Sequence, residues 1–161
     1  MATENQMMYS KATYKKVCES LDNLGWTYDK DEEGLNIFTG ASGVDLNISL
    51  RICIEPDKCL ATVLSELPFV VDMDSMVETS LVISYINNSL VDGSFDYNPV
   101  DGSIFFRNTV AFHDSNISEK VFGYMIYITC RTVDRYNGML KKLASSEISF
   151  SEAIEMIDGN K

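Results

Sequence analysis

Few residues in this sequence could do chemistry. His113 precedes Asp114, and a carboxylate beside an imidazole can orient a general base. A catalytic dyad also needs a nucleophile placed by that base in space, which sequence adjacency does not provide. We therefore predict a loop or capping role for His113, and no catalytic residue in the chain.

The four cysteines, Cys18, Cys53, Cys59 and Cys130, show no C-x-x-C spacing and are accompanied by a single histidine. A Cys/His zinc site is therefore not indicated. Apolar neighbours favour reduced, buried thiols. Cys53 and Cys59 flank a turn, but their expected offset would distort a disulfide. We predict no metal and no cofactor.

Two short segments have residue types found in ion sites. The acidic segment "DKDEE", residues 29–33, could offer carboxylates to a cation, but it lacks the ligand spacing and central glycine of an EF-hand loop. The segment "GASG", residues 40–43, is too short to cradle phosphate and does not stand between a strand and a helix. Both are interpreted as turns.

The charge balance bears on partners. The 161 residues carry 13 basic and 24 acidic side chains, a net charge of −11, which argues against nucleic acid and against anionic membrane surfaces. Residues 1–80 hold 14 acidic and 6 basic side chains, so the front half is expected to form the more acidic face. The acidity serves solubility or attracts a basic partner. The start "MATENQMMYS" does not resemble a signal peptide, and no long apolar run occurs, so we expect a soluble cytoplasmic protein.

The spacing of apolar residues predicts the elements of the first half. A stripe of Tyr14, Val17, Leu21 and Leu24, stopped by Gly25, indicates a helix over residues 10–24. Residues 35–40 read as a short strand. A second strand covers residues 44–54, whose even positions are all apolar and should face the helices: Val44, Leu46, Ile48, Leu50, Ile52 and Ile54. Residues 59–67 return as a third strand.

The next helix should begin with a capping box of Ser75 and Glu78, end near residues 87–90, and reverse at Gly93. Its expected buried stripe is Val82, Tyr85, Ile86 and Leu90. A hairpin follows, with Phe95 and Tyr97 on one arm, Ile104 and Phe106 on the other, and residues 98–102 as the turn.

The third long helix has Asn116 as its expected cap, with Glu119 three residues on. It carries two apolar stripes, whereas packing on a sheet requires one. The surplus residues are a candidate partner or homodimer surface: Met125, Ile128, Tyr136 and Met139. The alternative is that the sheet and the C-terminal tail, residues 144–161 with a short helix near 151–157, cover both stripes within one chain.

The predicted order is helix, three or four strands, helix, two strands, helix and tail. Short turns between consecutive strands predict an antiparallel sheet of five or six strands with helices packed against it, an α+β fold. The length favours a single domain, residues 1–161, with a core over about 9–143.

The segment from residue 84 to 112 resembles the YbjN family of bacterial proteins, also described as sensory transduction regulators. Family members show a helix ending in I-N-x-x-L, a glycine, an aromatic strand, an acidic glycine turn and a second strand. The matching residues here are Ile86, Asn87, Leu90, Gly93, Phe95, Asp101, Gly102 and Ile104 to Arg107. "GWTYDKDEEG" and "SELPF" also resemble family segments.

The same order of elements is similar to that of the type III secretion chaperones. The resemblance implies a non-enzymatic, protein-binding domain that acts as a regulator or chaperone-like adaptor. One alternative is a dedicated secretion chaperone that binds an effector segment. A second is a small-molecule sensor, which would need a concave pocket with convergent polar groups.

Overall fold

The computed structural model describes residues 2–113, 115 and 117–159, and its core is one antiparallel sheet in the order β1-β2-β3-β4-β6-β5. The strands are β1 (Asp29–Asp31), β2 (Asn36–Ser42), β3 (Asn47–Glu55), β4 (Leu60–Val70), β5 (Ser94–Tyr97) and β6 (Ser103–Ala111). The helices are α1 (Glu4–Leu24), α2 (Met76–Asn87), α3 (Glu119–Ala144) and α4 (Phe150–Gly159), with a 3-10 turn, η1 (Met73–Ser75), before α2. This order confirms the predicted α+β fold with six strands.

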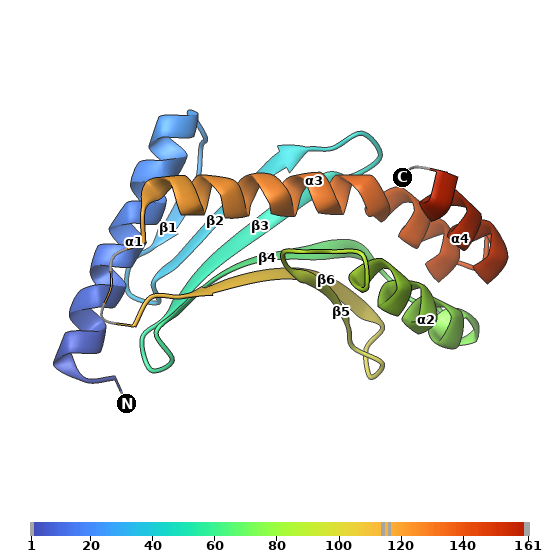
Figure 1. The fold of residues 1–161 in the computed structure, drawn as a ribbon, viewed down its shortest axis with the longest axis horizontal. Coiled ribbons are helices and arrows are strands. Elements are labelled where there is room, and N and C mark those ends of the chain that lie inside the picture. Colours follow the sequence, from blue (N-terminus) through green and yellow to red (C-terminus); the bar gives the residue numbers. More distant parts are fainter. Residues whose placement is uncertain (1, 114, 116, 160–161) are drawn as a thin grey trace.

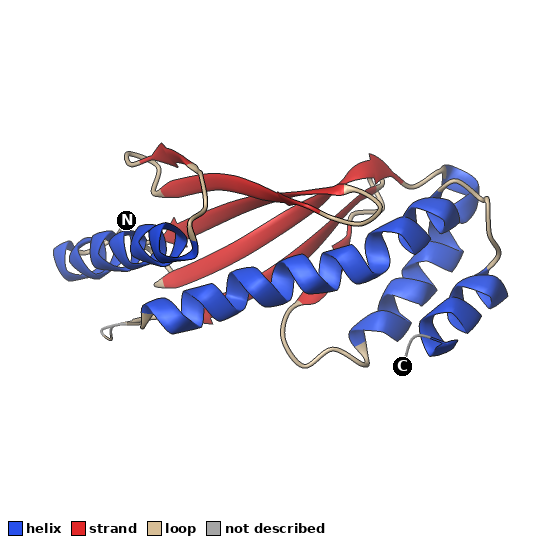
Figure 2. Ribbon diagram, turned by 90° about the horizontal axis from the view of Figure 1, so that it is seen from above, coloured by secondary structure: helices blue, strands red, loops and turns tan. Residues whose placement is uncertain are grey.

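The helices pack on one face of the sheet. Helix α3 runs along the sheet in contact with β4 and β6, α1 crosses it at one end, and α2 and α4 lie at the other end (Figures 1 and 2). The opposite face carries no helix from the described residues, as antiparallel sheets allow. None of the described helices has both the length and the apolar character needed to cross a bilayer.

Strand β3 confirms most of the predicted alternation. Its even residues from Ile48 to Ile54 are at most 4% exposed and face the helices. The prediction is wrong for Val44, which is 86% exposed, and for Leu46, which is half-buried. Both precede the strand in a loop, where the carboxylate of Asp134 on α3 accepts a 2.7 Å hydrogen bond from the backbone N–H of Val44. In the sequence the alternation of apolar and polar residues starts at Val44, whereas the strand itself starts only at Asn47.

Helix α1 begins six residues earlier than predicted because of a capping box that sequence reasoning overlooked. The backbone N–H of Gln6 donates to the Thr3 hydroxyl at 3.2 Å, and the backbone N–H of Thr3 donates to Oε1 of Gln6 at 2.8 Å. Gly25 ends the helix as predicted, with a left-handed φ of 71°. Leu24 is 49% exposed, while the other three members of the predicted stripe are buried.

The predicted capping box of α2 is wrong. Ser75 has no capping hydrogen bond to the helix, and its hydroxyl lies 2.6 Å from that of Ser146, because the turn η1 precedes the helix and redirects the side chain. Of the predicted buried stripe, Tyr85 lies at the surface and Leu90 is half-buried, whereas the other two members are buried. Gly93, with a φ of 75°, reverses the chain as expected.

Candidate functional site

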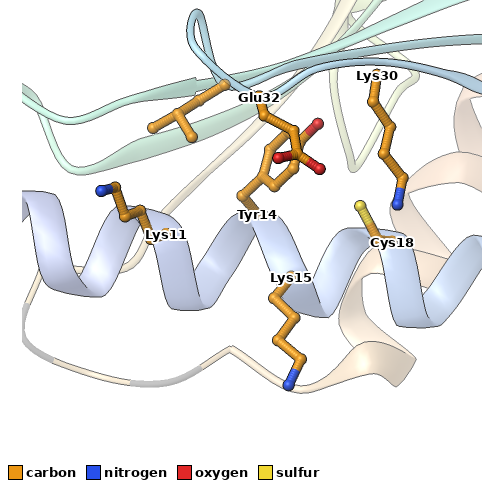
Figure 3. A pocket seen from close by; sticks show the side chains of 7 residues that line it. Lys11, Tyr14, Lys15, Cys18, Lys30 and Glu32 are labelled. Atoms are coloured by element: carbon orange, nitrogen blue, oxygen red, sulfur yellow. The ribbon is translucent and has the colours of Figure 1, made fainter.

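A groove runs between α1 and the hairpin formed by β1 and β2, with a volume of about 420 Å³ (Figure 3). One wall comes from the helix and the other from the hairpin. Its lining residues are Lys11, Tyr14, Lys15, Cys18, Lys30, Glu32 and Leu35.

The floor of the groove is apolar. Tyr14 and Cys18 are one helical turn apart on α1, and Figure 3 shows both side chains projecting toward the hairpin. They are each 7% exposed, and Leu35 of the hairpin is 6% exposed. The Tyr14 hydroxyl donates to the carbonyl of Asn36 at 3.4 Å, which joins the helix to the start of β2. The floor is therefore a fixed surface on which an apolar side chain can rest.

The rim of the groove is basic. Lys11, Lys15 and Lys30 are three of the six basic residues in residues 1–80, so the half of the chain predicted to be acidic carries a local cationic site. Glu32 is the one carboxylate among the lining residues. The lining thus has two more positive than negative charges, on a chain whose net charge is −11.

The two titratable groups of the floor are held in their neutral forms. Burial, followed by the neighbouring Cys18 and Glu32, raises the pKa of Tyr14 to about 12. Burial also raises the pKa of the Cys18 thiol, and the nearby Lys30 ammonium opposes that shift only in part. Because the thiolate and not the thiol is the nucleophile, this shift disfavours reaction at Cys18.

The candidate surface on α3 lies mostly inside the chain. Met125 is 3% exposed, Tyr136 5% and Met139 7%, and Ile128 is half-buried. The Tyr136 ring packs edge-on against Phe95 with ring centres 6.0 Å apart. Helix α3 contacts α1, the sheet, α2 and α4, which together cover its surplus apolar surface. In this conformation Met125, Tyr136 and Met139 are not accessible to a partner.

His113 and Cys59 lie near each other, although they are far apart in the sequence. They line an open hollow of about 570 Å³ with Asn5, Gln6 and Tyr9. His113 is exposed in the turn after β6, and Asp114 lies outside the described residues. The Cys59 thiol already donates to the carbonyl of Pro56 at 3.6 Å. All four cysteines are free thiols, and burial raises the pKa of Cys53.

The acidic segment 29–33 was predicted to be a turn, which is wrong for residues 29–31, since they form β1; the turn to β2 begins at residue 32. The carboxylate of Asp31 accepts hydrogen bonds from the backbone N–H of Gly34 at 2.9 Å and from Nδ2 of Asn36 at 3.2 Å. These bonds lower the pKa of Asp31. Among the described residues no three His, Cys, Asp or Glu side chains are grouped as metal ligands would be.

A second surface feature, which sequence reasoning missed, is an exposed apolar stripe that we call the α2 stripe: Met73, Val77 and Leu81. Their exposed fractions are 86%, 71% and 55%. Val77 and Leu81 are one turn apart on α2, and Met73 precedes them in η1. Glu78 is the one charged residue within α2 itself, and Asp72 and Asp74 are exposed on either side of Met73 in sequence.

The helix-free face of the sheet is hollowed but polar. Two adjoining hollows of about 660 and 440 Å³ share Arg51, Leu64 and Phe105. Several charged groups there have partners within the chain: the Arg107 guanidinium lies 2.8 Å from the carboxylate of Asp96, Lys58 pairs with Glu55, and Arg51 donates to the Asn36 amide oxygen. This composition is typical of a sheet face in contact with water.

The fold defines a class shared with two solved structures. One, described as "YbjN, a putative transcription regulator from E. coli", has a TM-score of 0.58 and 10% identity over 83% of this chain and 92% of that chain. The other, in the ExsC–ExsE complex, has a TM-score of 0.56 and 9% identity over 79% of this chain and 92% of that chain. The predicted likeness to the secretion-chaperone fold is confirmed.

The family is defined by sequence as well. The family model YbjN, described as "Putative bacterial sensory transduction regulator", matches residues 13–141. The chain belongs to the YbjN family, as the resemblance of its central segment predicted. A search of curated proteins found no match.

Proposed function

We propose that this YbjN-family chain is a non-enzymatic protein-binding domain that holds an extended segment of a partner protein in the groove beside α1. The observation that carries this proposal is the combination of an apolar floor, formed by Tyr14, Cys18 and Leu35, with an open, charged rim. Recognition sites for peptides combine a receiving apolar surface with polar groups that fix orientation.

The position of the groove favours an extended segment over a compact partner. The hairpin wall of the groove includes β1, which is a terminal strand of the sheet. A terminal strand presents backbone N–H and C=O groups to which a further strand can pair. An added segment would gain affinity by forming hydrogen bonds with these backbone groups. Every second side chain of that segment would lie on the groove floor.

A dedicated secretion chaperone is a second candidate, favoured by the similarity to the ExsC–ExsE structure. It would use the same groove, and the two functions differ in the fate of the partner. An exported protein bound in the groove would indicate the chaperone, and a resident cytoplasmic protein would indicate the regulator.

The location of the partner segment can be tested by photocrosslinking. With p-benzoylphenylalanine replacing Lys15, whose side chain is 79% exposed at the rim, we expect partner proteins of the native host to become covalently attached on illumination. The matched control carries the same group in place of Lys142, which is exposed near the far end of α3. Mass spectrometry of the crosslinked peptides identifies the attached segment.

The proposal requires crosslinks that form at position 15 and not at position 142. Equal attachment at both positions, or attachment at 142 alone, would exclude the groove as the binding site. The same experiment distinguishes the regulator from the chaperone, because the attached protein is identified by its sequence.

We also propose that the α2 stripe, and not α3, mediates self-association. A net charge of −11 repels a second copy, so copies approach most easily through a face with little charge. Tyr85, one turn beyond Leu81 on α2 and 36% exposed, extends the stripe. Light scattering should give about twice the 18.1 kDa chain mass.

Leu81→Asp is expected to yield a folded monomer, because a carboxylate in the centre of an apolar interface would lose its hydration without gaining a partner. Met8→Asp is the matched control, since Met8 is 56% exposed on α1, a helix that lies at the opposite end of the sheet from α2 (Figure 1). It should remain dimeric. A monomeric wild-type protein at tens of micromolar would disprove the dimer.

A further inference from the structure

We infer that the partner segment is acidic, with an apolar side chain on the groove floor and carboxylates on both sides of it that bind the rim lysines. This inference rests on the proposed function and specifies the chemistry of the partner. It is argued from the positions of the lysines, from their pairing, and from the charge of the whole chain.

The lysines stand on both sides of the floor. Lys11 and Lys15 are one turn apart on α1, and Lys30 comes from β1 across the groove. Figure 3 shows Lys30 beside Cys18 at one end of the floor and Lys11 beyond Tyr14 at the other. Lys15 points away from the hairpin and extends the cationic rim outward. An anchor on the floor would therefore have ammonium groups before and after it along the segment.

These ammonium groups are available to a partner. Among the described residues Lys11 forms no ion pair, and Lys15 approaches Glu19 only at 3.8 Å with its own side chain 79% exposed. The Lys30 ammonium lies 5.4 Å from the centre of the Tyr28 ring. Contacts of these kinds at exposed positions are weak, so a carboxylate can replace them at little cost.

Lys16, on a different side of α1, gives the contrast. Its ammonium is 2.7 Å from Glu19 and 3.4 Å from Glu119, and these carboxylates raise its pKa. Two carboxylates therefore hold the lysine that faces α3, whereas Lys11 and Lys30 beside the floor, and Lys15 at the outer rim, lack partners at comparable distances. This difference within one helix is expected if carboxylates of another molecule pair with the rim lysines.

The inferred preference runs against the charge of the chain as a whole. A net charge of −11 by itself favours basic partners. At physiological salt, charges separated by more than about 8 Å are largely screened, so the groups beside the groove decide the preference inside it. The carboxylates nearest the floor are those of Asp22, Asp31 and Glu32. Asp22 accepts a hydrogen bond from the Tyr28 hydroxyl and Asp31 accepts from Gly34 and Asn36, which leaves the rim lysines opposed mainly by Glu32. Selection of acidic peptides by this acidic chain would therefore indicate binding at the groove and not general electrostatic attraction.

A displayed library of random 12-residue peptides, selected against the immobilised full chain at 0.15 M salt, tests the inference. We expect the selected peptides to share an apolar residue flanked by Asp or Glu. The triple variant Lys11→Gln, Lys15→Gln, Lys30→Gln should lose this enrichment. The control Lys120→Gln, Lys141→Gln, Lys142→Gln changes the net charge equally at exposed positions and should keep it.

Synthetic peptides then give the magnitude. Replacing the acidic residues of a selected peptide with Asn and Gln should weaken its binding about tenfold, as expected for two or three exposed ion pairs. The rim variant should show a loss of the same size toward the acidic peptide and little change toward the neutral one. Replacing the apolar residue with Ser should weaken binding separately, which distinguishes a peptide site from simple attraction of anions.

The outcomes separate the inference from the proposed function. Selected peptides that are basic or neutral, yet crosslink at position 15, would overturn the inference and leave the groove as a binding site. Acidic enrichment that persists in the rim variant would also overturn it. If no selected peptide crosslinks at position 15, the groove is not a binding site, and both conclusions fail. Circular dichroism shows whether each variant is folded.

Discussion

Met125→Asp is expected to unfold the protein and not merely to separate two copies of it. Met125 is 3% exposed within a single chain and belongs to the hydrophobic core. An unpaired carboxylate there loses its hydration and costs several kcal/mol. Because a domain of this size has a stability of about 5–15 kcal/mol, the variant should lose most of its cooperative unfolding transition in urea.

Val121→Asp is the control, one turn earlier on the same side of α3. Val121 is 38% exposed in the first turn of the helix, where a carboxylate interacts favourably with the helix dipole. Its unfolding free energy should stay within about 0.5 kcal/mol of the wild-type value. A Met125→Asp protein that stays fully folded would show that Met125 faces outward, contrary to the structure.

The sequence could support only part of the prediction that α3 carries a partner surface. The two stripes on α3 are visible as periodicity, but periodicity does not reveal what covers them. Residues 4–24 and 150–159, at the two ends of the chain, fold back as α1 and α4 and contact α3. These contacts depend on the path of the chain, which no local pattern encodes.

Strand β3 shows the same limit on a smaller scale. The alternation predicted the facing of Ile48 to Ile54 because a strand fixes a period of two. It failed at Val44, which lies in a loop where its backbone N–H donates a hydrogen bond to the carboxylate of Asp134 on α3. Gly43 and Gly138 leave the space for this approach, since a Cβ at Gly43 would collide with Asp134 and one at Gly138 with Asp45.

The groove could be predicted only in part. The spacing of Lys11, Tyr14, Lys15 and Cys18 places two lysines and two floor residues on adjacent positions of one helix face, which is readable from the sequence. Nothing local places Lys30 opposite them, because the hairpin is brought to α1 by the sheet. The spacing of four residues between Met73, Val77 and Leu81 is also visible in the sequence. The prediction for this segment, however, concerned only the residues expected to be buried.

Asn87→Ala is expected to lower the free energy of unfolding by about 2–4 kcal/mol, because the Asn87 amide takes the place of a neighbouring strand at the sheet edge. The backbone N–H of Phe95 donates to Oδ1 of Asn87 at 2.8 Å, and Nδ2 of Asn87 donates to the Phe95 carbonyl at 2.9 Å. Phe95 is 2% exposed and packs against Phe106 with ring centres 5.0 Å apart. Alanine leaves both backbone groups of this buried residue without their partners.

The adjacent Asn88 is a matched control for this variant. Asn88 is exposed at the end of α2, and its side chain makes no hydrogen bond within the described part of the chain, so Asn88→Ala should change the unfolding free energy by less than about 0.5 kcal/mol. Asn87→Asp keeps the acceptor but loses the donor, and should fall between the two. Urea unfolding measures all three, and hydrogen exchange of the Phe95 amide should accelerate in Asn87→Ala alone. Equal effects of Asn87→Ala and Asn88→Ala would mean that the asparagine does not hold β5, and that the I-N motif serves the end of the helix instead.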